Sequence, residues 1–188
     1  LFIAGHFLKN KALIKKSTKL ILKELDEQIL NDGAHYECSA MYHSVILSKL
    51  CLSIEVARQG GYLSPEELIF LNNKASIMFS WLDSYSFPDG SWALFNDSAL
   101  GMSAGTLELK KCIKLLKINS KLTELNESGF RKLKYIDFEL IIKTGEIQPK
   151  HQPGHSHSDI LSYCLWYKGK QVIVDPGIST YEIGDVRL

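Results

Sequence analysis

The strongest constraint on the fold is a change in hydrophobic pattern near Leu125. Before this residue, mostly apolar side chains recur at helical spacing and form a stripe along one face of a helix: Ile14, Thr18, Ile21, Leu25 and Ile29. After it, short segments carry the alternation and the β-branched and aromatic residues that are typical of strands. This order predicts an α+β protein with a helical part over residues 1–125 and a β part over residues 126–188.

Two helices have well-marked ends in the sequence. Ser39 is a good N-cap, and the helix that it begins is expected to stop at Gly60-Gly61. The next helix has Ser64 as its N-cap, Pro65 at the first helical position and Glu67 to complete a capping box. These signals predict an α-hairpin.

Two more helices are predicted from turns and spacing. One carries the apolar stripe from Ile14 to Ile29 and ends at Asn31-Asp32-Gly33. The other covers Ser98 to Leu116, although it contains Gly101 and Gly105. Successive helices joined by turns are typical of rings and solenoids. Since two such hairpins cannot close a ring, the pattern predicts a segment cut from a longer protein.

Strands are expected at Tyr135–Lys143, Ile160–Tyr167 and Gln171–Val174. Lys168-Gly169 between the last two predicts a tight hairpin.

Charge and composition exclude some functions. The net charge of +1 over 188 residues provides no basic field for nucleic acid, so nucleic acid is not an expected partner. We also expect no membrane partner, because no apolar run reaches the length of a span. Four widely spaced cysteines in apolar or helical patterns are expected to be buried thiols: Cys38, Cys51, Cys112 and Cys164.

The segment His155-Ser156-His157-Ser158-Asp159 is the densest group of reactive side chains. In an extended segment, the spacing of the two histidines directs both imidazoles to the same face. Histidine titrates near neutral pH and is the commonest metal ligand. The pattern therefore favours acid–base or metal chemistry over an ordinary polar loop.

Asp175 is a candidate second metal ligand with His157. A simple hairpin about Lys168-Gly169 would pair Asp175 with Ser162, which lies about 16 Å along the strand from His157. A shared metal therefore requires a bend, a bulge or a loop.

Tyr42 lies in the first turn of the helix that Ser39 begins. The positive end of the helix dipole favours a tyrosinate there, and a phenol acts as base or acid near neutrality only with such help. The alternative is that Tyr42 and His43 are core residues with satisfied polar tips.

Other candidates line a possible cleft. Asn96 and Asp97 form either a helix N-terminus or the wall of a cleft, and Trp92 could stack on a sugar ring. Trp166 could stack in the same way or belong to the core.

Three segments together resemble the heparinase II/III family of polysaccharide lyases. They are residues 32–43 (DGAHYECSAMYH), residues 87–97 (FPDGSWALFND) and residues 154–177 with Tyr181, which begin GHSHSD and end VDPG. The resemblance implies the last helices of an (α/α) toroid followed by the first strands of an antiparallel β-sandwich. It also implies a periplasmic location, with a cytoplasmic one left open.

The resemblance further implies β-elimination at a uronic acid of an acidic polysaccharide, such as a glycosaminoglycan. Tyr42 would be the acid, or both acid and base, and His155 the base for one stereochemistry. The expected substrate contacts are His43, Trp92 and Asn96.

His157 and Asp175 match two ligands of a structural zinc, whose third ligand, a histidine, would follow Leu188. The residue that neutralises the substrate carboxylate would precede Leu1, so this segment alone is expected to be inactive.

Two other functions remain open from the sequence. A non-catalytic glycan-binding or surface-polysaccharide assembly protein would keep the cleft and lack the chemistry. A zinc-dependent hydrolase would use the histidines and aspartates to activate water.

Overall fold

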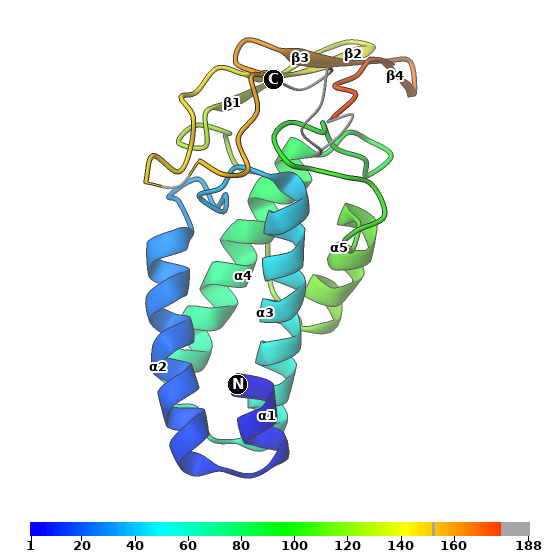
Figure 1. The fold of residues 1–188 in the computed structure, drawn as a ribbon. Coiled ribbons are helices and arrows are strands. Elements are labelled where there is room, and N and C mark those ends of the chain that lie inside the picture. The colour runs from blue at the N-terminus through cyan, green and yellow to red at the C-terminus, as the bar shows by residue number, and fades with distance from the viewer. Residues whose placement is uncertain (152, 178–188) are drawn as a thin grey trace.

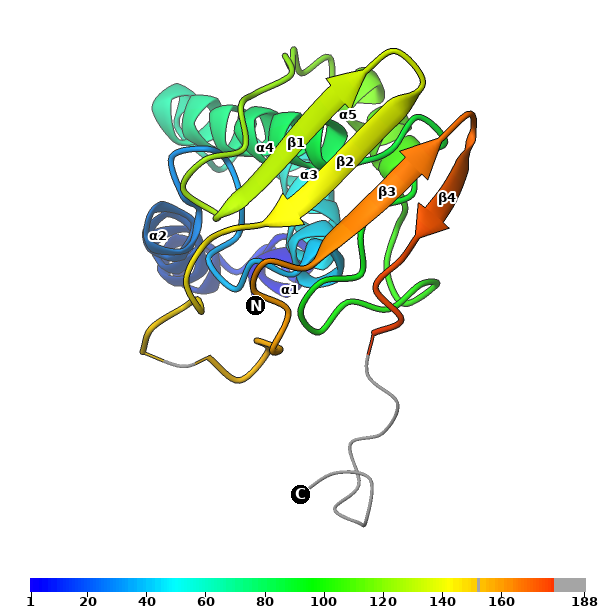
Figure 2. The same cartoon turned by 90° about the horizontal axis from the view of Figure 1, so that it is seen from above.

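A computed structural model describes residues 1–151 and 153–177 (Figure 1). Helices in the first part of the chain stand side by side, and an antiparallel sheet lies across one end of them (Figures 1 and 2). This arrangement confirms the expected α+β order. The helices are α1 (Phe2–Phe7), α2 (Lys11–Gln28), α3 (Ala40–Gly60), α4 (Pro65–Tyr85) and α5 (Thr106–Leu115).

The capping signals predicted the ends of α3 and α4 correctly. Ser39 accepts a hydrogen bond from the backbone of Tyr42, and α3 ends at Gly61, whose φ of 65° is left-handed. Ser64 and Glu67 form the reciprocal capping box of α4. Each cap satisfies backbone groups that have no partner within the helix.

Two predicted helix boundaries were wrong. Helix α2 ends at Gln28, before Asn31, because Ile29 turns away and forms a β-bridge with His35. Helix α5 begins at Thr106 rather than Ser98. Gly101 has a φ of 76°, which is incompatible with a right-handed helix, so residues before Thr106 form a loop instead.

The sheet contains β1 (Phe130–Tyr135), β2 (Phe138–Lys143), β3 (Tyr163–Tyr167) and β4 (Lys170–Ile173) in sequence order, all antiparallel. The predicted strand Tyr135–Lys143 therefore covers β2 and only the last residue of β1, and the rest of β1 was missed. The predicted hairpin is confirmed, since Lys168 and Gly169 have φ values of 46° and 86°, as a type I′ turn requires.

Aromatic rings join the helices to the sheet. Trp81 stacks on Tyr85 with ring centroids 4.9 Å apart, and Phe130 of β1 packs on Tyr85 at the same distance. The Asp32 carboxylate adds a polar link, because one of its oxygens accepts hydrogen bonds from the backbone of Asn126 and from the backbone and hydroxyl of Ser128. The loop after α2 is thus fixed to the segment that leads into β1.

The two faces of the sheet differ. Side chains such as Ile141 and Cys164, which are paired across β2 and β3, are buried against the helices. The outer face instead exposes large nonpolar side chains at alternate positions: Leu133, Tyr135, Phe138 and Tyr163. A sheet with nonpolar side chains on both faces is suited to a sandwich, in which a second sheet covers the outer face.

Helix α3 is long and apolar enough to span a membrane, by length and composition alone, which the sequence analysis did not anticipate. Within the described residues, 56% of the most apolar 18-residue stretch of α3 is buried. The helix packs against α4, α5 and α1. The core helix of a protein outside the membrane meets the same criterion, so this observation is weak support for a membrane span.

Candidate active site

Three segments meet at the N-terminus of α3. The cap residue Ser39 donates a hydrogen bond to the backbone carbonyl of Asp97, 3.0 Å away. The backbone N–H of Asp97 in turn donates to the carbonyl of His155, 2.9 Å away. These backbone links bring the loop before α5 and the loop between β2 and β3 to the first turn of α3, where Tyr42 lies.

The side chains of Tyr42 and His155 share one carboxylate oxygen. Tyr42 donates its phenolic hydrogen to Oδ2 of Asp97 at 3.4 Å, and Nδ1 of His155 lies 2.9 Å from the same oxygen. The two rings are also in contact, with centroids 4.3 Å apart. All three side chains are partly exposed, so a molecule outside the fold can reach them.

The tautomer of His155 follows from this contact. A carboxylate can only accept hydrogen bonds, so Nδ1 of His155 carries the hydrogen and donates it to Asp97. Nε2 of the neutral ring then keeps its lone pair, which is the state needed in a general base.

The pKa of Tyr42 is raised, and the expectation of a favoured tyrosinate was wrong. Burial is the largest cause, followed by the negative charge of Asp97 and the hydrogen bond to it. The expectation rested on the helix dipole alone and left out burial and the Asp97 carboxylate. Tyr42 therefore holds its proton at neutral pH and can donate it.

Asp97, expected only at a helix N-terminus or in the wall of a cleft, lies at the centre of the site. It follows Asn96, which has a left-handed φ of 58°. This turn separates two neighbouring side chains, because Asn96 faces the interior while Asp97 faces His155. The signal available in the sequence was a carboxylate in the same short motif as Asn96, since histidines that act as bases are often oriented by a carboxylate.

The three expected substrate contacts all lie below the surface. The exposed fractions of His43, Trp92 and Asn96 are 1%, 5% and 1%. Side chains buried to this degree cannot contact a polysaccharide in this structure, so the assignment is corrected. His43 and Asn96 lie beside Tyr42 and Asp97 in the chain and support them from the interior, and Trp92 is a core residue. Trp166 is also a core residue, and it stacks on Phe87 with centroids 5.4 Å apart.

His43 illustrates this supporting position. Its Nδ1 accepts a hydrogen bond from the backbone of His35 at 3.1 Å, and its Nε2 lies 3.0 Å from the carbonyl of Met78. Burial, together with the nearby His35, lowers the pKa of His43 to about 3. His43 is therefore a neutral core residue directly after Tyr42.

His157 and Asp175, the two expected zinc ligands, are both half-buried. A β-bulge pairs Leu165 with Ile173, so the strand that leads to Asp175 is shifted from the simple hairpin register. One Asp175 carboxylate oxygen accepts a hydrogen bond from Gly177 at 2.7 Å. Within residues 1–151 and 153–177, no group of three or more metal-binding side chains occurs.

Comparison with known proteins identifies the family. A model described as the heparinase II/III N-terminus matches residues 5–122, and one described as heparinase II/III-like, C-terminal, matches residues 117–187. The chain belongs to the heparinase II/III family. The resemblance seen in the three sequence segments is thus confirmed, although Tyr181 of the third segment lies outside the described residues.

Nearly the whole of this chain matches its relatives, but it spans only about a third of their length. A heparin-sulfate lyase from Bacteroides stercoris is 24% identical in an alignment 196 positions long, gaps included, which covers 94% of this chain and 29% of that protein. A mutant of heparan sulfate lyase HepC from Pedobacter heparinus matches with a TM-score of 0.71 and 16% identity, over 92% of this chain and 30% of that one.

A structure of heparinase III matches with a TM-score of 0.67 and 15% identity, over 96% of this chain and 34% of that one. At these identities, the structural matches establish that the heparinase II/III fold is shared.

Proposed function

We propose that the intact protein carrying this chain is a polysaccharide lyase that cleaves an acidic polysaccharide by β-elimination at a uronic acid. The observation that carries the proposal is the pair Tyr42 and His155, held at one oxygen of Asp97. Membership of the heparinase II/III family and the similarity to a heparin-sulfate lyase support it.

The reaction needs a base and an acid. The base removes the proton from the carbon next to the uronic acid carboxylate. The electron pair of that C–H bond forms a carbon–carbon double bond, while the bond to the glycosidic oxygen breaks. The acid protonates the departing oxygen, so the products are an unsaturated uronide and a new sugar hydroxyl. Each proton transfer contributes about 10²–10⁴-fold to the rate when it is positioned.

The two side chains suit different roles. Tyr42 is the acid, because its raised pKa keeps the phenol protonated and available to the leaving oxygen. His155 is the base for one stereochemistry, because Asp97 occupies its Nδ1 and leaves Nε2 for the substrate. For the other stereochemistry, Tyr42 would serve as both base and acid.

The proposed substrate class is a uronic-acid-containing glycosaminoglycan. The similar Bacteroides stercoris protein is named a heparin-sulfate lyase, and its chain extends well beyond the region shared here. The carboxylate of the bound uronic acid must be neutralised as the carbanion develops, which requires hydrogen-bond donors or cations from the intact protein.

We also propose that His157 and Asp175 help to bind a structural zinc in the intact protein. An imidazole nitrogen and a carboxylate oxygen are suitable zinc ligands, and a structural site needs four in total. Bound zinc would supply folding energy to the β part. Metal analysis of the intact protein tests this: about one zinc per chain that is lost in His157→Ala would support the proposal, and a metal-free protein would contradict it.

The catalytic proposal is tested with the intact protein and four polysaccharides: heparan sulfate, heparin, chondroitin sulfate and hyaluronan. We expect ultraviolet absorbance from unsaturated uronides with at least one of them. Tyr42→Phe should abolish this product, whereas Tyr62→Phe, at the opposite end of α3, should retain it. Full activity in Tyr42→Phe would rule out Tyr42 as the acid.

The same assay separates the alternatives. Cleavage without the chromophore, sensitive to chelators, would indicate a metal-dependent hydrolase. Binding of an oligosaccharide without cleavage would indicate a non-catalytic glycan-binding protein.

A further inference from the structure

A buried ion pair lies behind the candidate active site. The Lys143 ammonium, at the end of β2, donates to the carboxylate of Asp159 and to the side-chain oxygen of Asn96. Only 3% of the Lys143 side chain and 6% of the Asp159 side chain are exposed. Neither residue takes part in the proposed chemistry, so their presence in the interior needs another explanation.

The ion pair joins every segment that carries an active-site residue. The second oxygen of Asp159 accepts from the backbone N–H of Asn96 at 2.7 Å, which fixes the backbone directly before Asp97. The side chain of Asn96 donates to the carbonyl of Cys38 at 2.8 Å, directly before the cap of α3. It also accepts from the backbone of His157 at 3.4 Å, in the same loop as His155.

The backbone of Lys143 strengthens this connection. Its N–H donates to the carbonyl of Ser162 at 3.1 Å, and its carbonyl accepts from Leu161 at 2.7 Å. Lys143 therefore fixes both ends of the loop that contains His155, because the loop leaves the sheet directly after Lys143 and returns beside it.

Stability alone does not account for such an arrangement. Removing charges from water is costly, and buried ion pairs can often be replaced by nonpolar residues without loss of stability. Their directional contacts, however, restrict the geometry of the groups that they join. We propose that Lys143 is a positioning residue of the active site, acting through Asn96 and Asp159 on Asp97 and His155. This inference rests on the proposed lyase function.

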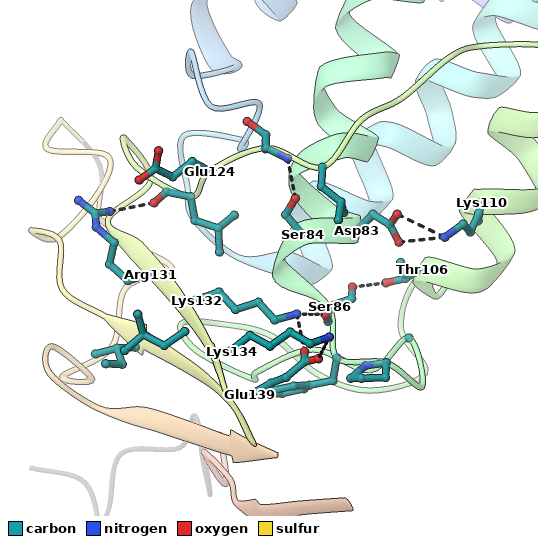
Figure 3. A pocket seen from close by; sticks show the side chains of 18 of the residues that line it. Asp83, Ser84, Ser86, Thr106, Lys110, Glu124, Arg131, Lys132, Lys134 and Glu139 are labelled. Carbon is teal, nitrogen blue, oxygen red and sulfur yellow. Dashed lines mark hydrogen bonds and ion pairs between the residues drawn. The ribbon is translucent and has the colours of Figure 1, made fainter. Parts of the chain in front are cut away.

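A second buried carboxylate, on β2 itself, provides a control. Glu139 is 7% exposed in its side chain and pairs with Lys132 at 2.9 Å and with Lys134 at 2.6 Å. Figure 3 shows these side chains in a cavity of about 750 Å³ between β1 and the ends of α4 and α5. Tyr42, Asp97 and His155 are absent from its lining.

Each site thus pairs a buried carboxylate with lysine, Asp159 with Lys143 and Glu139 with Lys132 and Lys134, and the two sites differ in what they connect. Lys132 also donates to the backbone carbonyl of Ser86 at 2.5 Å, so its pair holds the sheet against the end of α4. Loss of either pair should weaken packing between sheet and helices, but only loss of the Lys143 pair should disturb Asp97 and His155.

The experiment uses the intact protein and four variants. Lys143→Met leaves the Asp159 carboxylate without a lysine partner, whereas Lys132→Met leaves Glu139 paired with Lys134 alone. Both variants should lower Tm, Lys143→Met by more. The double variants Lys143→Met/Asp159→Leu and Lys132→Met/Glu139→Leu also remove the buried carboxylate and should recover much of that loss. The latter leaves Lys134, whose side chain is 69% exposed and reaches water. At a temperature at which all variants are folded, we expect kcat to remain about tenfold to a hundredfold lower in the Lys143 double variant. The KM of the Lys143 double variant should change by less than about threefold. The kcat and the KM of the Lys132 double variant should both stay within the same limit.

A crystal structure of the Lys143 double variant provides a readout that does not depend on turnover. We expect the contact between His155 Nδ1 and Asp97 Oδ2, 2.9 Å in the native protein, to be lost or lengthened. A native kcat in the folded double variant, or an unchanged contact, would overturn the proposal. If the native protein forms no unsaturated product, the lyase function fails, and the crystallographic result alone decides whether Lys143 positions His155.

Discussion

Nδ1 of His155 lies 2.9 Å from Oδ2 of Asp97, across 58 residues of sequence. This contact fixes the tautomer of His155, and the same oxygen accepts the phenolic hydrogen of Tyr42. One carboxylate therefore orients both proposed catalytic side chains.

Asp97→Asn should strongly reduce lyase activity. An amide offers one oxygen acceptor and an N–H₂ group, so it no longer enforces the Nδ1–H tautomer of His155. We expect kcat of the intact protein to fall by about 10²-fold or more, measured as the rate of unsaturated product formation. Asp83→Asn, which breaks the Lys110 pair outside the site, is the control and should keep native kcat. Equal rates in the two variants would remove Asp97 from the mechanism.

The two serine N-caps should have different consequences for activity. Ser39 caps α3 and also holds the backbone of Asp97, whereas Ser64 only caps α4. Loss of either cap by substitution with alanine should cost about 1 kcal/mol of stability. Only Ser39→Ala should also lower kcat, by about tenfold, because Asp97 loses an anchor. Calorimetry and steady-state kinetics give the two quantities, and an equal kcat in both variants would contradict the expectation.

The stability of the protein should fall as the pH falls below about 6.5, in part because of His43 and His35. Burial lowers their pKa values to about 3 and about 4 in the folded state. Unfolded histidine has a pKa near 6.5 and binds the proton more readily. Between the folded pKa of each histidine and pH 6.5, the free energy of unfolding therefore falls by up to about 1.4 kcal/mol per histidine for each pH unit of acidification. The contribution is fully present above pH 6.5.

His43→Asn should therefore have a weaker dependence of Tm on pH between about 4 and 6.5 than the native protein. Asparagine keeps an acceptor for the backbone of His35 and does not titrate. His151→Asn, at an exposed position, should retain the native slope. A native slope in His43→Asn would mean that His43 does not contribute to the loss of stability in acid.

Gly33 and Gly61 should differ in their tolerance of alanine. Both have positive φ, but a Cβ at Gly33 would lie 2.2 Å from the carbonyl oxygen of Ile77, while Gly61 has open space around it. Gly61→Ala should cost about 1–2 kcal/mol from backbone strain alone. Gly33→Ala should cost about 4 kcal/mol or more because backbone atoms must also move. Soluble yield and Tm provide the comparison, and equal losses would show that the α4 segment yields easily.

Local signals predicted much of the helical part and one turn of the sheet. The Ser64 capping box and the Lys168-Gly169 hairpin depend on residues close in sequence, and both are confirmed. Strand β1 was missed because Lys132 and Lys134 interrupt its hydrophobic pattern. Their charges are satisfied by Glu139 on the neighbouring strand, which sequence spacing does not reveal.

The sequence indicated two of the side chains that meet in the candidate site, but not the electrostatics around them. Tyr42 and His155 were selected from the sequence, and the structure brings them together. The pKa of Tyr42 was predicted to shift in the wrong direction, since burial and the Asp97 charge come from segments distant in sequence. Burial of His43, Trp92 and Asn96 is likewise a result of packing that short motifs do not contain.

The nonpolar outer face of the sheet matters for any recombinant piece of this protein. Leu133, Tyr135, Phe138 and Tyr163 present a contiguous apolar layer that water would cover in an isolated segment. Exposed sheets of this kind tend to pair with one another. Residues 1–188 produced alone should therefore self-associate and bind hydrophobic dyes, and a protein in which this face is covered should do neither.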